Sequence, residues 1–557
     1  MRLFIFLYIV LLSFSIGQNK KDKIVFDNKE SYEDYFKLLE KSFKYLKVNY
    51  VDSLNESEIV KEGIKGFSKQ LDPYTKLLSG KSKEKYDDLR RGKYGGVGIQ
   101  LGMRRDTLTI LSVFENSPAY SEGLLVGDDI MMVDSTSTSG LSLKECLKAI
   151  KGEIDSVVTF HVYRKLTKEK LKFDLVRSNV ALKNVPYWGV NENNVGYIRM
   201  TRFSKNSDKD FKLALNELND LNMSGLIIDL RGNSGGLLSV AINILDYLTD
   251  RGEILLVQKG KTNRSNKEWK SKRRPIIDLD IPIVVLINKS SASASEIVAG
   301  SLQDLDRALV IGEKSFGKGL VQNMYNLNDS LVIKITTAKF YLPSGRLIQK
   351  QDYLNNGFLT DGLDKKDTPF ITKMGREVKG GGGITPDFLV KKEKLNPFIN
   401  ALWREKVFLA FASDYLSGNK DIDMPIIIND DMKIKFSKFV ENFDLKYKFP
   451  IEKNLEEMND YFSEINISIN PISKNISVNK GNSSIMSDLN AYFKAYKKMQ
   501  IYLPENRRMI YNGLLREFSR LISGEKERIR VGLFVDEVYN RAVDIIISDE
   551  YYENFGY

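Results

Sequence analysis

The chain has 557 residues, of which 42% are hydrophobic and 28% charged, and its formal net charge is +11. This length exceeds what one hydrophobic core supports, so roughly three or four domains are expected. With one histidine, His161, and one cysteine, Cys146, the chain has no intramolecular disulfide and few options for a metal site or a histidine base, so no metal or cofactor is expected. The positive charge is spread along the chain without a recognition motif, which argues against nucleic-acid binding.

The first residues have the pattern of an export signal. Arg2 precedes the apolar run Leu3–Leu12, and small residues up to Gly17 follow it. The run is too short to span a bilayer comfortably, so residues 1–17 are predicted to be a signal peptide that directs the protein to the periplasm. The alternative is an uncleaved signal that holds the protein at the membrane.

The remaining chain divides into four segments by hydrophobic pattern. In order they are a helical N-terminal segment (18–90), a region of short strands and glycine turns (91–178), a region in which strands alternate with helices (179–390) and a helical C-terminal domain of unknown role (391–557). Strands that alternate with helices predict an α/β layer with its reactive loops at strand ends. The chain is therefore expected to be a multidomain protein of mixed α+β and α/β class.

Individual elements support this division. Apolar residues recur at helical spacing between Phe36 and Leu46, and the alternation in Val157–Arg164 predicts a strand. Asn396 followed by Pro397 is a good helix start, with asparagine as the cap. The basic stretch Lys259–Arg274 is either an anion-binding patch or a solvated excursion between strands, and the excursion is the favoured interpretation.

Four serine motifs compete for the role of nucleophile. Gly232–Gly236 satisfies G-x-S-x-G, with Ser234 between a predicted strand and a predicted helix, as a nucleophile elbow requires. An elbow serine needs a histidine later in the chain, whereas His161 precedes Ser234 and is predicted to lie on a strand. The elbow interpretation is therefore rejected.

Two further motifs contain a serine and a lysine. Ser315 and Lys318 form S-x-x-K, a spacing that works when a helix places both side chains on one face. Gly317 and Gly319 flank this lysine and disfavour a helix. The stretch Ser82–Lys85 is strongly charged and is predicted to lie on the surface.

The fourth motif is Asn288–Ile297, where the apolar strand Pro282–Ile287 runs into small residues that open a helix. A serine at a helix N-terminus is close to unpaired backbone N–H groups and to the positive end of the helix dipole, which suit a developing oxyanion. From composition alone, a helix cap surrounded by small packing residues is the favoured interpretation.

From about Tyr35 to Val390 the sequence resembles the C-terminal processing peptidases, also called tail-specific proteases, which are S41-type serine peptidases. The resemblance implies a crotonase/ClpP-like protease core with an inserted PDZ domain. Its motifs occur in order at Leu71–Tyr74, Gly95–Ile99, Ser117–Ala119, Gly123–Leu124, Gly127–Asp128, Asp229–Gly236, Ser291–Ile297, Gly312–Glu313, Phe316–Gly319, Pro343–Arg346 and Gly383–Asp387.

The resemblance also implies catalytic roles. It assigns Ser293 as the nucleophile and Lys318 as its base, and a buried lysine can serve as a base because burial lowers its pKa. Ser234 stands where the family often has a proline, a departure that leaves the chemistry intact. Further roles implied by the resemblance are a supporting glutamine, Gln322, and oxyanion-hole amides from Ala294 and from Gly235 or Gly236.

The segment Gly95–Ile99 resembles the carboxylate-binding loop of PDZ domains, so Gly96, Val97, Gly98 and Ile99 are expected to bind a peptide C-terminus. The expected function is that of an exported serine endopeptidase acting on polypeptides with free apolar C-termini. Rival interpretations are a catalytically silent PDZ scaffold and a hydrolase of esters or small peptides. The C-terminal domain is expected to serve in homo-oligomer formation or adaptor binding.

Overall fold

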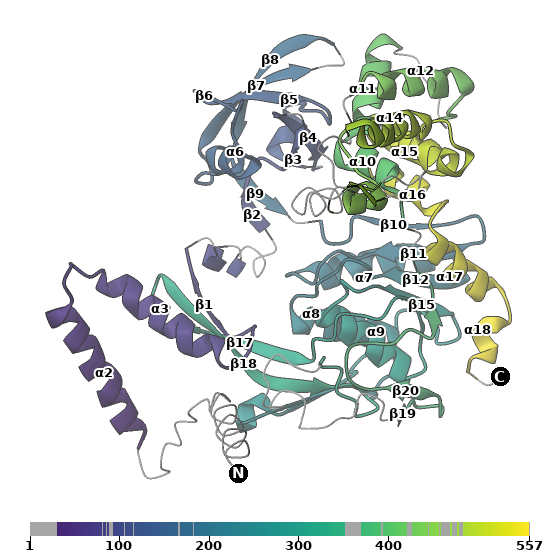
Figure 1. Ribbon diagram of the computed structural model, residues 1–557. Coiled ribbons are helices and arrows are strands. Elements are labelled where there is room, and N and C mark those ends of the chain that lie inside the picture. Colours follow the sequence, from purple (N-terminus) through teal and green to yellow (C-terminus); the bar gives the residue numbers. More distant parts are fainter. Residues whose placement is uncertain are drawn as a thin grey trace, which may run out of the picture. The chain divides into compact units, whose positions relative to one another are not determined.

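The computed structural model (Figure 1) describes residues 31–555 except 81, 85, 88–92, 105, 115, 165–166, 182, 351–368, 392–393, 420–425, 444, 456, 458–467, 470–475 and 478–482. The predicted signal peptide, residues 1–17, lies outside these ranges. Within them, no helix combines the length and the apolar character needed to cross a membrane. The chain divides into two compact units, with the boundary between Leu71 and Asp72.

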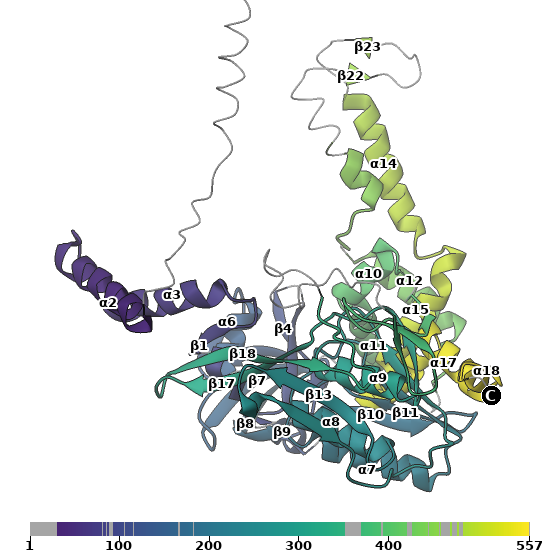
Figure 2. The same ribbon diagram turned by 90° about the horizontal axis from the view of Figure 1, so that it is seen from below.

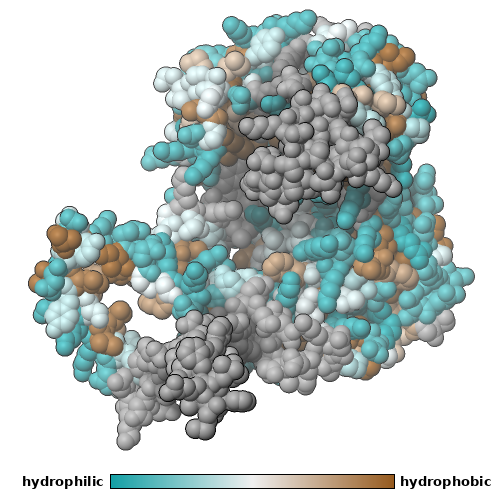
Figure 3. Space-filling model, viewed as in Figure 1, coloured by the Kyte–Doolittle hydropathy of each residue, from teal (hydrophilic) through white to brown (hydrophobic). Residues whose placement is uncertain are grey.

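The described part of the first unit contains two helices, α2 (Tyr32–Asn49) and α3 (Glu56–Lys69). Asn55 caps α3 by accepting a hydrogen bond from the Glu58 amide at 3.2 Å. No residue of α2 is buried, and its apolar side chains remain exposed, as the hydrophobic residues on these helices in Figure 3 show. The apolar spacing correctly predicted a helix here.

A six-stranded sheet forms the centre of the second unit. Its strand order is β10-β11-β12-β15-β16-β21, and all neighbours are parallel except β10 and β11. Three of the central strands are buried along their whole length, as the continuous apolar runs of a parallel sheet require. The strands are β10 (Tyr187–Val190), β11 (Val195–Arg199), β12 (Gly225–Asp229), β15 (Ile283–Ile287), β16 (Leu309–Gly312) and β21 (Phe388–Leu389).

Helices cover both faces of this sheet, because successive strand residues point to opposite sides. Ile228 and Val285 pack in one cluster with α7 (Ser207–Asp220), α8 (Leu238–Leu248) and α9 (Ala294–Asp304). Their sequence neighbours Ile227 and Val284 pack in the other cluster with α17 (Glu537–Ile547), and α18 (Glu550–Glu553) adds Tyr551 to it. The last two helices of the chain are therefore part of the central layers, although the sequence assigned them to a separate C-terminal domain.

A second, antiparallel sheet lies beside the first. It joins β1 (Lys76–Ser79), β13 (Ile254–Gly260), β14 (Lys267–Lys270), β17 (Leu320–Asn326) and β18 (Leu331–Tyr341). The helical segment predicted to reach residue 90 thus contains a strand, because Leu77 and Leu78 are buried where β1 pairs with β18. The basic stretch predicted as an excursion is instead largely a hairpin, β13 and β14 with a 3-10 turn (Asn263–Ser265) between them.

The region predicted as short strands folds into a six-stranded sheet that contains β3 (Ile99–Arg104), β4 (Thr107–Val113), β5 (Asp129–Val133), β6 (Thr136–Ser137), β7 (Val157–Arg164) and β8 (Glu169–Val176). Two helices, α5 (Pro118–Ser121) and α6 (Leu143–Ile150), accompany this sheet. Their common core includes Cys146 and Phe160. A short ladder of β2 (Lys93–Gly96) with β9 (Ser178–Ala181) lies where this region begins and ends.

The remaining helices gather in a separate aromatic core, and Figures 1 and 2 both show them side by side. Phe411 contacts the rings of Phe436 and Phe518 edge to face. The predicted helix start is confirmed, since the Asn396 side chain accepts from the Ile399 amide at 2.8 Å. These helices are α10 (Pro397–Arg404), α11 (Val407–Gly418), α12 (Asp430–Glu441) and α15 (Pro504–Ser523).

The other elements are α14 (Ser483–Met499), α16 (Glu525–Leu533), β19 (Pro369–Ile371), β20 (Glu377–Lys379), β22 (Ser468–Ile469) and β23 (Ile476–Ser477). The multidomain architecture of mixed helix and sheet expected from the sequence is confirmed.

Candidate active site

Three loops meet at the carboxyl ends of the parallel strands β12, β15 and β16. Because these strands are neighbours in the sheet, the loops that leave them lie side by side, which is where open α/β sheets place their sites. The loops span residues 230–237, 288–293 and 313–319. They carry the glycine motif, the serine cluster and the lysine that the sequence singled out.

Hydrogen bonds join the glycine motif to the serine cluster. The Asn233 carbonyl accepts from the Ala292 amide at 3.1 Å and from the Ser295 hydroxyl at 2.8 Å. Gly235 has a φ of +91°, and a Cβ at this position would lie 2.5 Å from the Ala292 oxygen and 3.0 Å from the Ser293 Cβ. Only glycine permits this approach, so the motif holds its backbone directly against Ser293.

Ser293 is the residue before the first turn of α9, and its backbone is strained. Its φ and ψ are 57° and −111°, an unfavourable conformation for a residue with a side chain. The helix that follows is buried along its whole length, which keeps this turn in place. Strained backbone of this kind is found at active sites, and here a buried strand and a buried helix hold the serine in position.

A buried carboxylate, Glu296, links the serine turn to the lysine loop. Its Oε2 accepts from the Ser293 amide at 2.7 Å and from the Lys318 amide at 2.9 Å. Its Oε1 accepts from the Ser315 hydroxyl and the Gly317 amide, both at 2.6 Å. Burial raises the pKa of Glu296, while these four donors act to lower it. One side chain therefore fixes the backbones of both predicted catalytic residues.

The Lys318 side chain lies in a half-buried site beneath an aromatic ring. Its Nζ is 4.8 Å from the centroid of the Tyr74 ring. Burial, together with the charge of Lys334, lowers the pKa of Lys318 to about 8. Phe316, two residues before the lysine, is 42% exposed, so the ring that covers Lys318 is that of Tyr74.

The Leu71–Tyr74 motif explains how Tyr74 reaches this position. The Asp72 carboxylate accepts from the Thr75 amide at 2.8 Å and from the Thr75 hydroxyl at 2.7 Å. Thr336 of β18 donates its hydroxyl to Asp72 at 3.2 Å and its amide to Thr75 at 3.1 Å. The turn that carries Tyr74 is therefore anchored to the strand that pairs with β17, the strand beginning just after Lys318.

The residues expected to support catalysis differ in their surroundings. The Gly235 amide donates to the Asn233 side chain at 2.9 Å, so it is already engaged. The amides of Ala294 and Gly236 remain as the oxyanion-hole candidates. Gln322 pairs with Thr336 across β17 and β18, and its Nε2 is buried without a hydrogen-bond partner among the described residues.

The rejected serines are also located by the structure. Ser234 lies exposed on the glycine loop, and His161 lies on β7 in a different sheet. Ser315 is in an extended loop rather than a helix, and it donates to Glu296 while accepting from the Ile384 amide at 2.6 Å. Across the part of the chain that the structure describes, no cluster of three acidic, histidine or cysteine side chains could hold a metal ion.

Hydrogen bonds and ion pairs among charged side chains also hold the glycine loop in place. Asp229 accepts two bonds from the Arg231 guanidinium, of 2.9 and 2.6 Å, one from the Arg231 amide at 2.9 Å and one from the Tyr197 hydroxyl at 2.7 Å. Arg231 in turn donates to both oxygens of Asp536, which lies just before α17, at 2.8 Å each. Burial would raise the pKa of Asp229, yet the charges of Arg231 and Arg199 lower it to about 2. The C-terminal helices thus support the loop beside Ser293.

The predicted peptide-binding loop, from Gly96 to Ile99, leads into strand β3. Gly98 has a φ of +83°, and a Cβ there would lie 2.1 Å from the Ser117 Cβ, so glycine is required. Among the described strands β3 pairs only with β4, which leaves its other edge unpaired. An unpaired edge beside a glycine loop is the geometry that peptide addition needs.

Tyr74 and Glu296 both stand within motifs that the sequence singled out, but the sequence did not reveal their roles. A carboxylate three residues after the serine was a signal for a helix-start bond to the Ser293 amide. Its bonds to Lys318 and Ser315 depend on a loop that packs nearby only in the folded chain.

Comparisons with known proteins match two segments of the chain to known families. Residues 194–357 match the profile of peptidase family S41, and residues 95–175 match that of the PDZ domain. The carboxy-terminal-processing protease of Bartonella bacilliformis is 33% identical over 311 residues, which cover 55% of this chain and 71% of that protein. The carboxy-terminal processing protease CtpB of Bacillus subtilis is 32% identical over 316 residues, or 56% of this chain and 65% of that protein.

Among solved structures, the photosystem II D1 C-terminal processing protease is 26% identical, with a TM-score of 0.35, and the match covers 64% of this chain and 86% of that one. The family assignment rests on the sequence matches, which extend over both the PDZ segment and the protease core. This chain belongs to the carboxy-terminal processing proteases of peptidase family S41, serine peptidases that carry a PDZ domain.

Proposed function

We propose that this protein is an endopeptidase in which Ser293 is the nucleophile and Lys318 the general base. The observation that carries the proposal is the shared carboxylate oxygen of Glu296, which accepts from the amides of both residues at 2.7 and 2.9 Å. The burial and lowered pKa of Lys318 support it further, because only a neutral amine can accept the serine proton.

The chemistry follows from these positions. Neutral Lys318 takes the Ser293 hydroxyl proton as the oxygen attacks the scissile carbonyl carbon. The amides of Ala294 and Gly236 stabilise the oxyanion, and removing one such donor raises the barrier by about 2.7–4 kcal/mol. Protonated Lys318 gives the proton to the leaving amine, and water then hydrolyses the acyl-enzyme with Lys318 as base. Gln322 is proposed to support the lysine.

The substrates are proposed to be polypeptides with free, largely apolar C-termini. A tail that adds to the open edge of β3 would place its terminal carboxylate at the loop Gly96–Ile99. Export to the periplasm through residues 1–17, and homo-oligomer formation or adaptor binding through the C-terminal domain, complete the proposal. A hydrolase of small esters uses the same dyad but has no need of a PDZ segment.

The test is cleavage of an unfolded reporter with an apolar C-terminal tail. Ser293→Ala and Lys318→Ala are expected to abolish cleavage, while the control Ser234→Ala retains most of it. Amidation of the tail is expected to raise KM, since the amide cannot occupy a carboxylate loop. If Ser234→Ala alone is inactive, the rejected elbow is the true site. If the wild type hydrolyses small esters only, the polypeptide assignment is wrong.

A further inference from the structure

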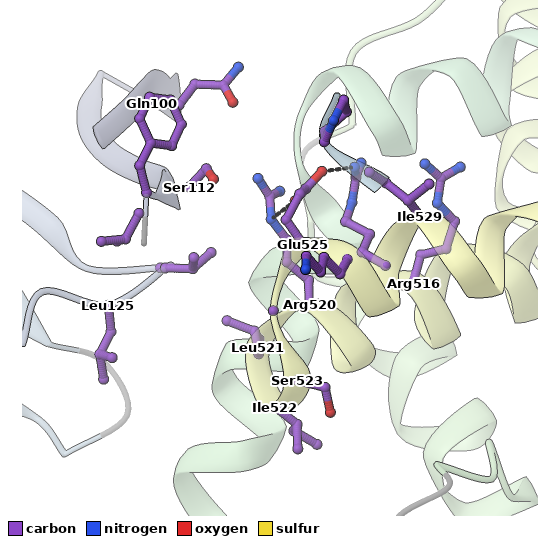
Figure 4. A pocket seen from close by; sticks show the side chains of 18 of the residues that line it. Gln100, Ser112, Leu125, Arg516, Arg520, Leu521, Ile522, Ser523, Glu525 and Ile529 are labelled. Atoms are coloured by element: carbon purple, nitrogen blue, oxygen red, sulfur yellow. Dashed lines mark hydrogen bonds and ion pairs between the residues drawn. The ribbon is translucent and has the colours of Figure 1, made fainter. Parts of the chain in front are cut away.

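A cavity of about 960 Å³ lies apart from the proposed active site, and neither Ser293 nor Lys318 lines it. One wall consists of β3, β4 and the loop before β5, with Gln100, Ser112 and Leu125 labelled in Figure 4. The opposite wall consists of α15 and α16, with Arg516 among the residues labelled there. Nothing in the proposed mechanism uses this cavity.

The acidic side chains that line the cavity are already paired. Glu525 forms ion pairs with Arg520 at 3.1 Å and Arg528 at 2.9 Å. Asp128 pairs with Arg164 at 2.7 Å, and Asp536 with Arg231 at 2.8 Å. Each of these carboxylates therefore already forms an ion pair with an arginine other than Arg516.

The other two arginines that line the cavity differ in their compensation. Burial acts to lower the pKa of Arg199, but the charge of Asp229, 3.5 Å away, raises it, so this guanidinium is compensated. Arg516 forms no ion pair within the described ranges, and its Nε is buried without a hydrogen-bond partner. Burying a guanidinium without a carboxylate is costly, and proteins accept that cost where a ligand supplies the charge.

Two contacts hold the Arg516 side chain in position. Its guanidinium carbon lies 5.1 Å from the centroid of the Trp403 ring, which holds the plane in place. A Cβ at Gly532 would lie 3.3 Å from the Arg516 Nε, so any larger residue there would press on the guanidinium. Burial and the charge of Arg528 lower the pKa of Arg516 to about 10, and the charge of Arg199 adds to the effect.

We propose that this cavity is an oxyanion-binding site in which Arg516, with Arg199 beside it, binds a carboxylate or phosphate group. Guanidinium groups suit such ligands because they donate two parallel hydrogen bonds to a pair of oxygens. The ligand is either a free ion or an acidic side chain of a polypeptide bound between the two walls. The site is independent of the Ser293–Lys318 assignment.

The experiment uses the full chain carrying Ser293→Ala, so that no probe is cleaved. Binding of inorganic phosphate at constant ionic strength, and of an acidic peptide against its Glu→Gln counterpart, is measured by calorimetry and by the shift in Tm. We expect Arg516→Met to weaken binding by about tenfold or more, as expected for loss of one charge-assisted bond. Phosphate binding identifies a free ion as a sufficient source, and selective binding of the acidic peptide identifies a polypeptide.

Two controls separate binding from folding. Arg530→Met removes an arginine of the next helix, α16, that pairs with Glu527 and does not line the cavity, so it should leave binding unchanged. In chloride without ligand, Arg516→Met should be as stable as the wild type or more stable, whereas Arg528→Met, which breaks two ion pairs, should lower Tm. The proposal is overturned if neither probe binds, if Arg516→Met binds them equally well, or if it lowers Tm as Arg528→Met does.

Discussion

The replacement of Glu296 by glutamine tests whether one carboxylate holds the catalytic loops together. The substitution keeps the shape but leaves one oxygen for four donors. The best orientation turns the new NH₂ group toward Ser315, whose hydroxyl can accept, and leaves the Gly317 amide without a partner. The Ser293 and Lys318 amides then keep a neutral acceptor in place of a charged one.

The expected loss follows from these contacts. A hydrogen bond to a charged group contributes about 1.5–3 kcal/mol, so loss of the Gly317 bond alone should lower Tm by roughly 3–12 °C at about 2–4 °C per kcal/mol. Small shifts of reacting groups are costly, and a displacement of about 1 Å can reduce the rate by about 100-fold. We therefore expect kcat/KM to fall by about 10- to 100-fold.

The assay combines thermal unfolding with kcat/KM on the reporter. Asp246→Asn is the matched control, because Asp246 is a buried carboxylate that accepts from the Ser271 hydroxyl at 2.8 Å and from two amides, away from the loops. It should lower Tm and leave kcat/KM unchanged. The reasoning fails if Glu296→Gln keeps Tm within about 1 °C and kcat/KM within about twofold of the wild type.

Three further changes test the remaining contacts. Because only neutral Lys318 is a base, kcat/KM should rise with pH through a midpoint near 8 and level off above it. Lys334→Met should move this midpoint to higher pH by removing a charge that lowers the pKa, and an unchanged pH profile would refute this. The depressed pKa of Asp229, about 2, should contribute about 2.5 kcal/mol of stability above its unfolded pKa near 4. Urea unfolding should show that this contribution is lost as the pH falls from about 4 to 2, and Asp229→Asn should not show this loss. Gly235→Ala should abolish activity, since its Cβ would lie 2.5 Å from a backbone oxygen. The Cβ of Gly232→Ala would have nothing within 4 Å, so this variant should lose only about 1–2 kcal/mol of stability. Similar kcat/KM values for the two variants would contradict the close approach at Gly235.

The place of the C-terminal helices changes the interpretation of the domain plan. Leu533, Val538 and Ile546 pack against the central sheet, and the Tyr551 hydroxyl accepts from the Ile283 amide at 3.0 Å. A truncation before α17 would therefore expose one face of the protease sheet. The expectation of an oligomer or adaptor role applies to the helices before α16, whose aromatic core is separate.

Local chemistry explains why the sequence predicted the strands and helices that flank the site loops. Each loop is a short run in which glycines, small residues and a preceding apolar strand are contiguous, so the pattern is complete within about ten residues. The strand Ile283–Ile287 and the helix from Ala294 follow from such patterns. The same locality misled the prediction for Leu77 and Leu78, because a four-residue strand has too few residues to show a period.

By itself the sequence determined the family, the order of the domains and the loops expected to carry the nucleophile and the base. Tertiary structure alone decided how these loops are held. Glu296 reaches Lys318 only after β15 and β16 pair, and Arg231 meets Asp536 across 305 residues of chain. The same holds for Arg516, since only the folded chain shows that its Nε has no hydrogen-bond partner among the described residues. Contacts of this kind leave no periodic trace in the sequence, because their spacing is set by the packing of whole layers rather than by the local backbone.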